Sequence, residues 1–478
     1  MAAGALARAL RIPPLLGELL VQRGLADAAA AADFLDPKFK NLHAPSLLPH
    51  MDAATERIAG AVRNGEKITL YGDYDVDGIT GTAMLWHTLK AARANVDSYI
   101  PHRVDEGYGL NTEAVRTLID AGTQLLVTID CGCSAIEPIT YARAHHVDVI
   151  VSDHHEFPSS GELPPAIIVH PRLPGSATVY PNPDLCGAGV AFKLAWAIAQ
   201  KLCNTERVNE TYRGLLLAFA ALVELGTIAD VVPLVGENRI LVKYGLTQLA
   251  RSTNPGLRAL IAAAGFGGDS ERALDCTAVG FSLAPRLNAA GRMGHAREAV
   301  ELLTTATGQR AEELAAYLEE QNRDRQATER KMADTAREQI EKRKSAIDRE
   351  DMVLVAAHPS FHAGVVGIVA SRLVDRFHRP AFVLSQPDGE GLLHGSARSI
   401  PSFELHLAID AVRDLLISGG GHAMAGGGKL PLANLDTFRE RLNAYAREKL
   451  SEEDFILSLP ISGTLSLIDC TPAIIAQL

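Results

Sequence analysis

Short apolar runs alternate with segments of helical periodicity between residues 67 and 170. The runs are rich in β-branched residues and predict strands at 67–72, 96–100, 125–130, 148–153 and 166–170. Helices are predicted between the first four of them, at 79–94, 111–121 and 134–146. Such a βαβ series predicts a parallel sheet covered by helices on both faces, so we expect an α/β fold.

The remaining pattern predicts a helical region and then a second α/β segment. The pattern of residues 187–300 predicts mostly helices. Residues 309–348 contain charges of both signs, no Gly or Pro, and apolar residues three or four apart, which predicts a long exposed helix joining two domains. Strands at 352–357 and 380–385 flank a predicted helix at 364–377.

These patterns divide the chain into five parts. We expect an N-terminal extension at 1–50, a parallel-sheet domain at 51–308, the connecting helix at 309–348, a smaller α/β domain at 349–450 and the start of a further β-rich domain at 451–478. The last part is strand-like but short, so we expect the chain to be a truncated form or a fragment.

Composition and hydropathy indicate a soluble protein of several domains. The chain has 478 residues, of which 47% are hydrophobic, and is too long for one ordinary core. Its longest apolar run, 214–226, contains Glu224 and predicts a buried helix rather than a membrane span. The apolar N-terminus includes Arg8, Arg11 and a Pro pair, which argues against a signal peptide, so we expect a cytoplasmic location.

Cysteine usage and net charge exclude some function classes. The six cysteines, at 131, 133, 186, 203, 276 and 470, form no CxxC pair, and we expect free thiols rather than disulfides or a zinc site. A net charge of −11 argues against coating nucleic acid by bulk electrostatics. It still permits a polyanionic substrate held by divalent ions and local arginine clusters.

Three aspartates alternate directly after the first predicted strand, in 70-LYGDYDVDGITG-81. Asp73, Asp75 and Asp77 match the opening of a calcium-binding EF-hand loop, but the glutamate required at its twelfth position is Met84 here. An aspartyl nucleophile, ligands of catalytic divalent ions and a solvated acidic turn remain as alternatives for this motif alone.

Other polar residues end further strands of the predicted sheet. Asp130 ends the third strand and 153-DHH-155 ends the fourth, and ligands bind at this edge of open α/β sheets. Asp230 follows the apolar helix. Carboxylates with one or two imidazoles suit Mn²⁺ or Mg²⁺ better than zinc, and two ions about 4 Å apart form a clamp for phosphoester displacement. Asp130 is the best candidate for the carboxylate that bridges them.

Phosphoester hydrolysis also requires donors for the phosphate oxygens. The candidates lie near glycines and are Arg103, Arg286, Arg292, Ser396, Arg398 and His422. Neighbouring glycines let backbone N–H groups approach an anion. The glycine-rich segment 418–430 is not a Walker loop, because Ala423 and Leu430 occupy two of its essential positions.

An ordered set of motifs between about residues 40 and 450 resembles the DHH phosphoesterase superfamily. The motifs are 72-GDYDVDG-78, 128-TIDCG-132, 152-SDHH-155, 226-GTIADVVPL-234, 284-APRLNAAGRM-293, 395-GSARS-399 and 419-GGGHAMAGG-427. The LNAAGRM segment and the long helix resemble the branch of single-strand-specific 5′→3′ DNA exonucleases more than the smaller relatives. The resemblance implies a parallel-sheet DHH domain, a smaller DHHA1 domain, and an OB-like β domain that begins near residue 451.

The resemblance also implies a two-ion centre. One Mn²⁺ (or Mg²⁺) would be held by Asp75 and Asp130 with Asp73 nearby, and the other by Asp77, Asp130, His154 and Asp230. His155 would contact the scissile phosphate, while Asp153 would orient the histidines. Tyr71 stands where relatives place a metal-binding histidine, so the shell of the first ion departs from the family pattern.

Residues that hold DNA follow from the same resemblance. Arg103, Ser396 and Arg398 are similar to residues that bind the 5′-terminal phosphate, and His422 is similar to a phosphate-binding residue of the second domain. DNA contacts are also expected from Arg286, Asn288 and Arg292. A groove between the domains that is too narrow for a duplex would select single strands through steric exclusion and base stacking.

These expectations combine into one hypothesis and two alternatives. We expect a metal-dependent 5′→3′ exonuclease that degrades single-stranded DNA to 5′-mononucleotides in DNA repair and recombination. It would be a monomer without membrane contact, working with a helicase and a single-strand-binding protein. The alternatives are a DHH phosphodiesterase acting on short oligoribonucleotides or dinucleotides, and a non-catalytic DNA-binding replication scaffold.

Overall fold

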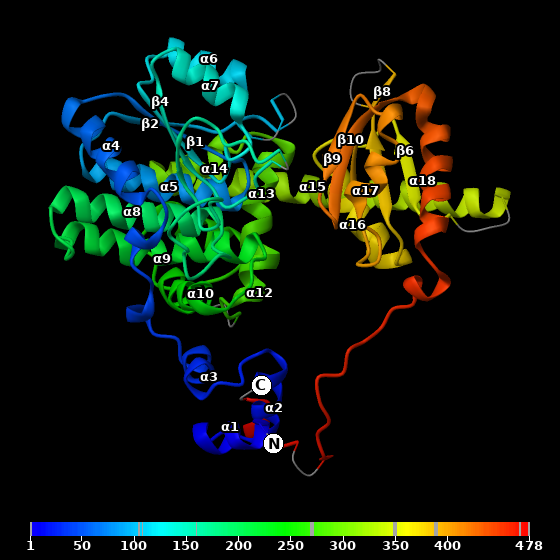
Figure 1. Ribbon diagram of the computed structural model, residues 1–478, viewed down its shortest axis with the longest axis horizontal. Helices are drawn as coiled ribbons and strands as arrows, with labels where there is room; N and C mark the ends of the chain where they lie inside the picture. The colour runs from blue at the N-terminus through cyan, green and yellow to red at the C-terminus, as the bar shows by residue number, and fades with distance from the viewer. Residues whose placement is uncertain are drawn as a thin grey trace. The chain divides into compact units, whose positions relative to one another are not determined.

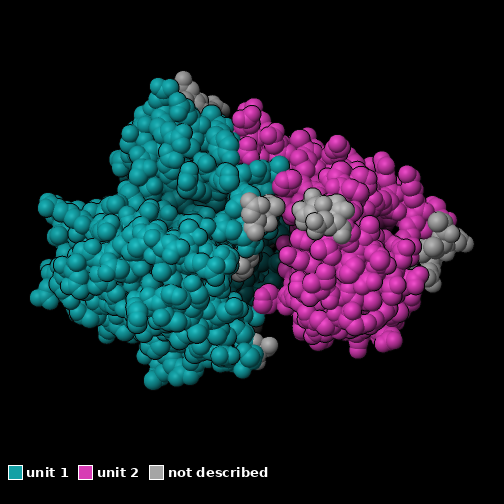
Figure 2. All heavy atoms as spheres, turned by 90° about the horizontal axis from the view of Figure 1, so that it is seen from above, with its two compact units in different colours: residues 1–319, 460–478 teal, residues 320–459 magenta. Residues whose placement is uncertain are grey.

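The chain forms two compact units, residues 1–319 with 460–478 and residues 320–459, shown in different colours in Figure 2. The structure is a computed structural model, and it describes residues 2–103, 106–107, 109–158, 160–267, 272–347, 351–386, 391–467 and 470–476. The division between the units falls inside the long helix α15 (Gly308–Ile347). Each unit contains its own sheet (Figure 1).

Five parallel strands form the sheet of the first unit. They are β1 (Ile68–Gly72), β2 (Val96–Tyr99), β3 (Leu125–Ile129), β4 (Asp148–Ser152) and β5 (Ile167–Val169), arranged in the order β2-β1-β3-β4-β5. Each pair of neighbours is parallel. β1 and β3 are buried along their whole length, as expected for strands covered on both faces, and the predicted parallel sheet is confirmed.

Helices cover both faces of this sheet (Figure 1). One face packs against α6 (Thr112–Asp120) and α7 (Ile136–Ala144), and the other against α4 (Met51–Asn64) and α5 (Val76–Ala91). Side chains alternate along a strand, so Leu70 of β1 enters the core around α5 while Tyr71 enters the core around α6 and α7.

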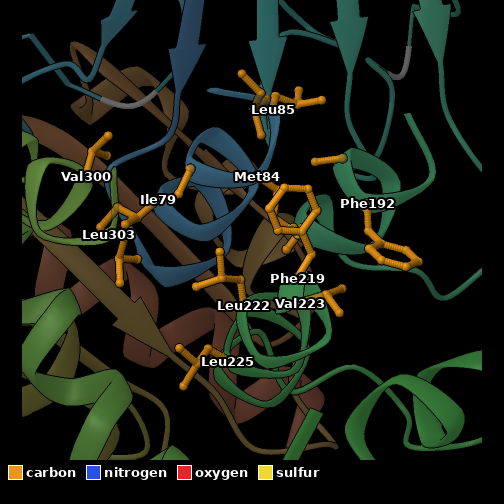
Figure 3. Close-up of a cluster of buried hydrophobic side chains, with 14 of the residues drawn as sticks. Ile79, Met84, Leu85, Phe192, Phe219, Leu222, Val223, Leu225, Val300 and Leu303 are labelled. Atoms are coloured by element: carbon orange, nitrogen blue, oxygen red, sulfur yellow. The ribbon is translucent and has the colours of Figure 1, made fainter. Parts of the chain in front are cut away.

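Helix α5 is the centre of the larger core. It packs between α8 (Gly187–Cys203) and α9 (Glu210–Ala229), and Figure 3 shows Ile79 and Met84 of α5 among Phe192 of α8 and Phe219 of α9. Because helices surround α5, its buried residues lie on every side rather than along one stripe. The first turn of α5 contains the aspartate motif, so this packing fixes the motif in space.

The remaining elements of the first unit are short helices. They are α1 (Ala2–Leu10), α2 (Pro14–Gln22), α3 (Ala28–Leu35), η1 (Phe39–Asn41), η2 (Pro45–Leu47), α10 (Gly236–Leu249), α11 (Pro255–Ala263), α12 (Cys276–Ala278), the π-turn η3 (Val279–Leu283), α13 (Ala284–Met293) and α14 (Arg297–Thr304). By length and composition α9 could cross a membrane, but 56% of its most apolar window is buried inside the protein. The run 214–226 lies in a helix as predicted, and its residues from Phe219 onwards are buried, while Gly214 and Leu217 are exposed.

The second unit contains a mixed sheet in the order β6-β7-β8-β10-β9. Its strands are β6 (Leu354–His358), β7 (Ala381–Ser385), β8 (Leu392–Arg398), β9 (Ser418–Gly421) and β10 (Ala425–Pro431). Only β6 and β7 pair in parallel. Its helices besides α15 are α16 (Val366–Phe377), α17 (Leu405–Asp410), η4 (Arg413–Leu415), η5 (Leu432–Asn434) and α18 (Leu435–Lys449).

The glycine-rich segment forms a β-hairpin of strands β9 and β10, in which glycine allows close strand packing. A Cβ added at Gly427 would lie 2.6 Å from the carbonyl oxygen of Gly395 on β8. Backbone groups of these glycines therefore take part in strand pairing, which differs from the loop-like anion cradle that the sequence suggested.

The β-rich C-terminal segment predicted from the sequence is not confirmed. After η6 (Glu452–Phe455), the described residues 456–467 form no strand, and α19 (Pro472–Ile475) follows. Ile456, Leu459 and Ile461 are exposed there. An apolar run forms a strand only where another strand supplies hydrogen-bonding partners, and the described part of the chain offers none at this segment.

Candidate metal centre

The turn between β1 and α5 is built around Asp75. Asp75 caps α5, and its Oδ1 accepts hydrogen bonds from the backbone N–H groups of Asp77 (3.0 Å) and Gly78 (3.2 Å). A Cβ at Gly78 would lie 2.5–2.7 Å from backbone atoms of Asp73, so only glycine fits at this position. The turn therefore holds the three aspartates of the motif at the end of β1.

Asp77 is fixed by the first turn of α8. Its Oδ2 accepts from the N–H of Gly187 (2.5 Å) and its Oδ1 from the N–H of Ala188 (2.8 Å). A helix N-terminus stabilises a carboxylate through its free N–H groups and its dipole. Gly226 of α9 approaches the same side chain, and a Cβ there would lie 2.5 Å from Asp77 Oδ1. The sequence patterns did not reveal these backbone donors.

Asp130 occupies a strained position directly after β3. Its φ of 62° lies in the left-handed region, which non-glycine residues rarely adopt. Its Oδ1 lies 3.2 Å from His154 Nε2 and 3.7 Å from His155 Nδ1. A Cβ at Gly187 would lie 2.5 Å from the same oxygen, so α8 abuts this carboxylate.

Asp153 holds the loop that follows β4. Its Oδ1 accepts from His155 Nδ1 (2.9 Å) and from the N–H of His154 (2.7 Å), and its Oδ2 accepts from the N–H of Cys133 (2.9 Å). Burial alone would raise the pKa of Asp153, but the hydrogen bond from His155 outweighs it and the pKa lies below its ordinary value. Burial lowers the pKa of His155, yet the bond to Asp153 raises it to about 9.

Asp230 closes the cluster from α9. It is the C-cap of that helix, and its Oδ2 lies 3.7 Å from His154 Nε2. Asp77 Oδ2 lies at the same distance, 3.7 Å, from that nitrogen. Burial lowers the pKa of His154 although Asp77 opposes this, and the neutral imidazole it favours is the form that binds a metal.

The seven side chains form three overlapping groups with metal-ligand spacing. Within each group the ligand atoms lie within 4.8 Å of one another, and the groups are Asp73–Asp75–Asp130, Asp77–His154–Asp230 and Asp130–His154–His155. Asp130 belongs to two of them and contacts His154 of the third. The structure thus brings together every residue that the sequence predicted as a metal ligand.

Unpaired buried atoms show that this donor set fits divalent cations. Asp73 Oδ1, Asp130 Oδ1 and His154 Nε2 are buried and have no hydrogen-bond partner in the described part of the chain. Such burial costs free energy unless a cation compensates it. Burial, followed by repulsion from neighbouring aspartates, raises the pKa of Asp73, Asp75 and Asp130, and raises that of Asp230 to about 8. The oxygen-rich ligands match Mn²⁺ or Mg²⁺.

The predicted phosphate donors of the first unit differ in their surroundings. Arg103 stacks on Tyr74, with its guanidinium carbon 4.8 Å from the ring centroid. Asn288 Oδ1 accepts from the N–H of Val76 (3.0 Å), so it braces the aspartate turn. Arg292 is half-buried near the C-terminal end of α13.

Arg286 is engaged inside the first unit. Its Nε lies 2.5 Å from Glu319 Oε2, its Nη1 donates to the carbonyl of Ser282 (2.6 Å), and its side chain is 13% exposed. The guanidinium therefore serves a structural ion pair in this structure, and a direct contact with DNA has less support for Arg286 than for Arg103.

The predicted donors of the second unit share one end of its sheet. Arg398 Nη1 donates to Ser396 Oγ (3.1 Å) on β8, and a Cβ at Gly367 in the first turn of α16 would lie 3.1 Å from that hydroxyl. The N–H of His422 donates to Ala425 (2.7 Å), which pairs with Arg398. A guanidinium, a hydroxyl and a helix N-terminus together suit a phosphate.

Two residues after β5 support the histidine loop, and the sequence analysis missed them. His170 Nε2 lies 2.8 Å from the carbonyl of His155, and Arg172 Nη2 donates to the carbonyl of His154 (3.1 Å). They follow the fifth strand at the same sheet edge, so the rule that found Asp130 could have found them. Tyr71, where the resemblance would place a metal-binding histidine, instead donates to the carbonyl of Gly109 (2.9 Å).

Comparisons with known proteins agree with this geometry. The model "DHH family, N-terminal domain" matches residues 67–220, and the model "DHHA1 domain" matches residues 350–448. The chain is 42% identical over 470 residues to the single-stranded-DNA-specific exonuclease RecJ of Bacillus subtilis, covering 98% of this chain and 57% of that protein. It is 35% identical to the protein of the same name from Escherichia coli, covering 96% of this chain and 79% of that protein.

Solved structures show the same fold. A crystal structure of RecJ in complex with Mn²⁺ from Thermus thermophilus matches with a TM-score of 0.76 and 33% identity, covering 93% of this chain and 60% of that one. A crystal structure of exonuclease RecJ bound to manganese matches with a TM-score of 0.70 and 35% identity, covering 85% of this chain and 98% of that one. The chain therefore spans little more than half the length of some of these relatives.

Proposed function

The chain belongs to the RecJ family of DHH phosphoesterases, and on that premise we propose that it is a metal-dependent 5′→3′ exonuclease that degrades single-stranded DNA to 5′-mononucleotides. The observation that supports the chemistry best is the cluster of three overlapping metal-spaced groups at the carboxyl edge of the sheet, two of which contain Asp130. The relatives' names support the substrate.

The side chains divide the work between two Mn²⁺ or Mg²⁺ ions. Asp75 and Asp130, with Asp73, would hold one ion, and Asp77, Asp130, His154 and Asp230 would hold the other. Bound divalent ions supply the positive charge that stabilises the transition state of phosphodiester hydrolysis. Asp130 would contribute to both sites, because it lies in one group with Asp73 and Asp75 and in another with His154.

His155 acts on the substrate rather than on the ions. Its Nδ1 is committed to Asp153 (2.9 Å), so Nε2 is the ring nitrogen that contacts an oxygen of the scissile phosphate. Burial lowers the pKa of His155 and the hydrogen bond to Asp153 raises it, and a protonated ring can donate from Nε2 to that oxygen. Asp153 orients the ring and also holds the backbone of the same loop, so it is a positioning residue.

The DNA strand is held by donors away from the ions. In the second unit, Ser396 and Arg398 bind the 5′-terminal phosphate and His422 binds a phosphate of the strand. In the first unit, Arg103 is a further donor for the 5′-terminal phosphate, and Asn288 and Arg292 contact the strand next to the aspartate turn. Arg286 contributes indirectly through its ion pair. The protein acts as a cytoplasmic monomer in repair and recombination, with a helicase that unwinds duplexes and a single-strand-binding protein as partners.

End-labelled substrates test this proposal. Single-stranded DNA carrying a 5′-phosphate and a label at either end is incubated with Mn²⁺ or with a chelator. The 5′-label should leave first, as a mononucleotide, and only with the metal. Early release of the 3′-label would refute the polarity. Preference for short RNA over DNA of equal length would favour the oligoribonucleotide phosphodiesterase, and no cleavage at all would favour the scaffold.

A further inference from the structure

A cavity of about 880 Å³ opens within the second unit, away from the residues assigned to DNA and metal. Its walls come from the end of α15, from β6, from the end of α16, from α18 and from η6. Every lining residue lies between 339 and 455, and none is Ser396, Arg398 or His422. The volume is within the range of about 300–1,000 Å³ that small-molecule sites occupy.

The cavity is strongly cationic, in a chain whose net charge is −11. Its lining includes six cationic side chains, Lys342, Arg343, Lys344, Arg376, Arg379 and Arg439. Only two acidic side chains, Glu341 and Asp351, belong to the lining. Lys342 and Arg376 are exposed and form no ion pair with the described residues. Such a concentration of positive charge favours an anionic ligand.

Two guanidinium groups of the cavity wall are each paired with one carboxylate, but one of them keeps a buried N–H group without a partner among the described residues. Arg343 pairs with Asp351 (Nε–Oδ2 2.6 Å), and Arg439 pairs with Asp436 (Nη1–Oδ1 2.7 Å). The side chain of Arg439 is 14% exposed, and its Nε is buried without a hydrogen-bond partner among the described residues. Burial and then the nearby charge of Arg343 lower the pKa of Arg439, although Asp436 and Asp351 oppose this.

An apolar wall adjoins these cations. It is formed by Ile340, Leu354, Val355, Phe377 and Phe455. The ring of Phe455 lies 4.1 Å from the guanidinium carbon of Arg379, so a cation already stacks on this aromatic surface. Free phosphate would leave the apolar wall unused, whereas a ligand with a planar ring and an anionic group uses both sides of the cavity.

We propose that this cavity binds a 5′-phosphorylated nucleoside, with the phosphate between Arg343, Arg376 and Arg439 and the base against the wall formed by Phe377 and Phe455. The ligand is either a free mononucleotide or the 5′-terminal nucleotide of a strand, since both present the same chemistry. The site is separate from the β8 donors, so its occupation does not depend on the exonuclease activity proposed above.

Calorimetric titration of the full chain with dAMP, in the presence of a chelator, tests the site without the metal centre. Arg376→Glu reverses an exposed charge in the cavity, and Phe455→Leu removes the ring while keeping an apolar side chain. Arg447→Glu is the matched control, because Arg447 is exposed on α18 and does not line the cavity. Arg398→Ala reports on the β8 donors. Circular dichroism of each variant verifies its fold.

The dissociation constant for dAMP should rise at least about tenfold in Arg376→Glu, because this variant loses one charge-assisted hydrogen bond to the phosphate. It should also rise in Phe455→Leu and stay unchanged in Arg447→Glu. Arg398→Ala should remove at most a second binding event at the β8 donors and leave the binding event that Arg376→Glu weakens. Deoxyadenosine and inorganic phosphate should each bind at least about tenfold more weakly than dAMP, because each lacks one half of the ligand.

Three results would overturn the proposal: no saturable binding of dAMP, phosphate binding as tight as dAMP binding, or weakening by Arg398→Ala without weakening by Arg376→Glu. A 5′-phosphorylated oligonucleotide distinguishes the two sources of the ligand. Competition with dAMP assigns the site to a strand end, and absence of competition assigns it to the free mononucleotide; both results support the proposed chemistry.

Discussion

At the scale of single residues, the centre depends on side chains that orient the ligands as much as on the ligands themselves. Asp153 binds both histidines of its loop and the backbone of Cys133, yet it belongs to none of the metal-spaced groups. Its substitution should therefore impair the action of His155 while leaving the ions in place.

Asp153→Asn should lower kcat by about 10- to 100-fold, the usual cost of losing a partner that orients a functional histidine. Steady-state kinetics on 5′-phosphorylated single-stranded DNA, together with a Mn²⁺ titration, measures both effects. Asp148→Asn is the control, because Asp148 lies at the opposite end of the same strand. An unchanged kcat in Asp153→Asn, or the loss of both ions, would contradict the positioning role.

Gly187 is a second residue on which the centre depends. A Cβ at this position would lie 2.5 Å from Asp130 Oδ1, so Gly187→Ala should displace the shared carboxylate and weaken Mn²⁺ binding by about 10-fold or more. Isothermal titration with Mn²⁺ gives the measurement. In the control Gly214→Ala the new methyl group meets no atom within 4 Å. Equal Mn²⁺ affinity of the two variants would show that α8 does not constrain Asp130.

At the scale of elements, the strand ends were predictable and the helix contacts were not. Short β-branched runs between helical patterns located the strands before Asp73, Asp130 and Asp153, and one topological rule placed these residues at a common edge. The donors to Asp77 lie 110 residues further along the chain, at Gly187, where no local pattern marks them. Nor did the sequence reveal that Arg286, which is expected to contact DNA, forms an ion pair with Glu319.

The C-terminal prediction failed for a related reason. The apolar residues after 455 have the composition of strands, but composition does not supply a neighbouring strand to pair with. The aspartate motif alone likewise left three interpretations open. A metal centre is identified only because four separate segments of the chain bring their side chains together. These side chains are Asp77, Asp130, His154 and Asp230.

Helix α9 carries a buried carboxyl group that should make stability depend on pH. Glu224 is fully buried, and neither carboxyl oxygen has a hydrogen-bond partner in the part of the chain that the structure describes. Burial raises its pKa well above the ordinary value of 4.5, so the folded state keeps a proton that the unfolded state releases. The protonated side chain of Glu224 thus contributes stability to the fold. The contribution is fully present below the pKa of Glu224 in the unfolded state, and it is lost as the pH rises towards the pKa of Glu224 in the folded state.

Glu224→Gln removes this dependence. Denaturation by urea at pH 5, 6, 7 and 8 should show the variant gaining stability over the original chain by up to about 1.4 kcal/mol per pH unit. The difference should be smallest at pH 5 and largest at pH 8. Parallel stability curves for the two proteins across this range would mean that Glu224 is ionised or paired in the folded state.

At the scale of the whole molecule, the metal centre links the stability of one unit to divalent ions. All seven clustered side chains belong to the first unit, and a ligand that binds only the folded state stabilises it by mass action. In calorimetry of the full chain, Mn²⁺ at about 100 times its dissociation constant should stabilise the first unit by about 2.7 kcal/mol per site. A chelator should reverse this shift and leave the transition of the second unit unchanged.

The same experiment can contradict the assignment of the ions. If Mn²⁺ raised the melting temperature of the second unit instead, the ligands would lie outside the β1, β3 and β4 strand ends. If neither transition moved, the buried carboxylates would be protonated rather than metal-bound at neutral pH. Calcium in place of Mn²⁺ is a useful comparison, because its larger radius demands more ligands than this cluster offers.

The central claim is that Asp130 serves both ions, and the Mn²⁺ stoichiometry of Asp130→Ala tests it most directly. Equilibrium titration followed by the electron paramagnetic resonance of free Mn²⁺ should give two bound ions for the original chain and at most one for the variant, with nuclease activity lost. A variant that still binds two Mn²⁺ ions with the original affinity, or that still degrades single-stranded DNA, would contradict the claim.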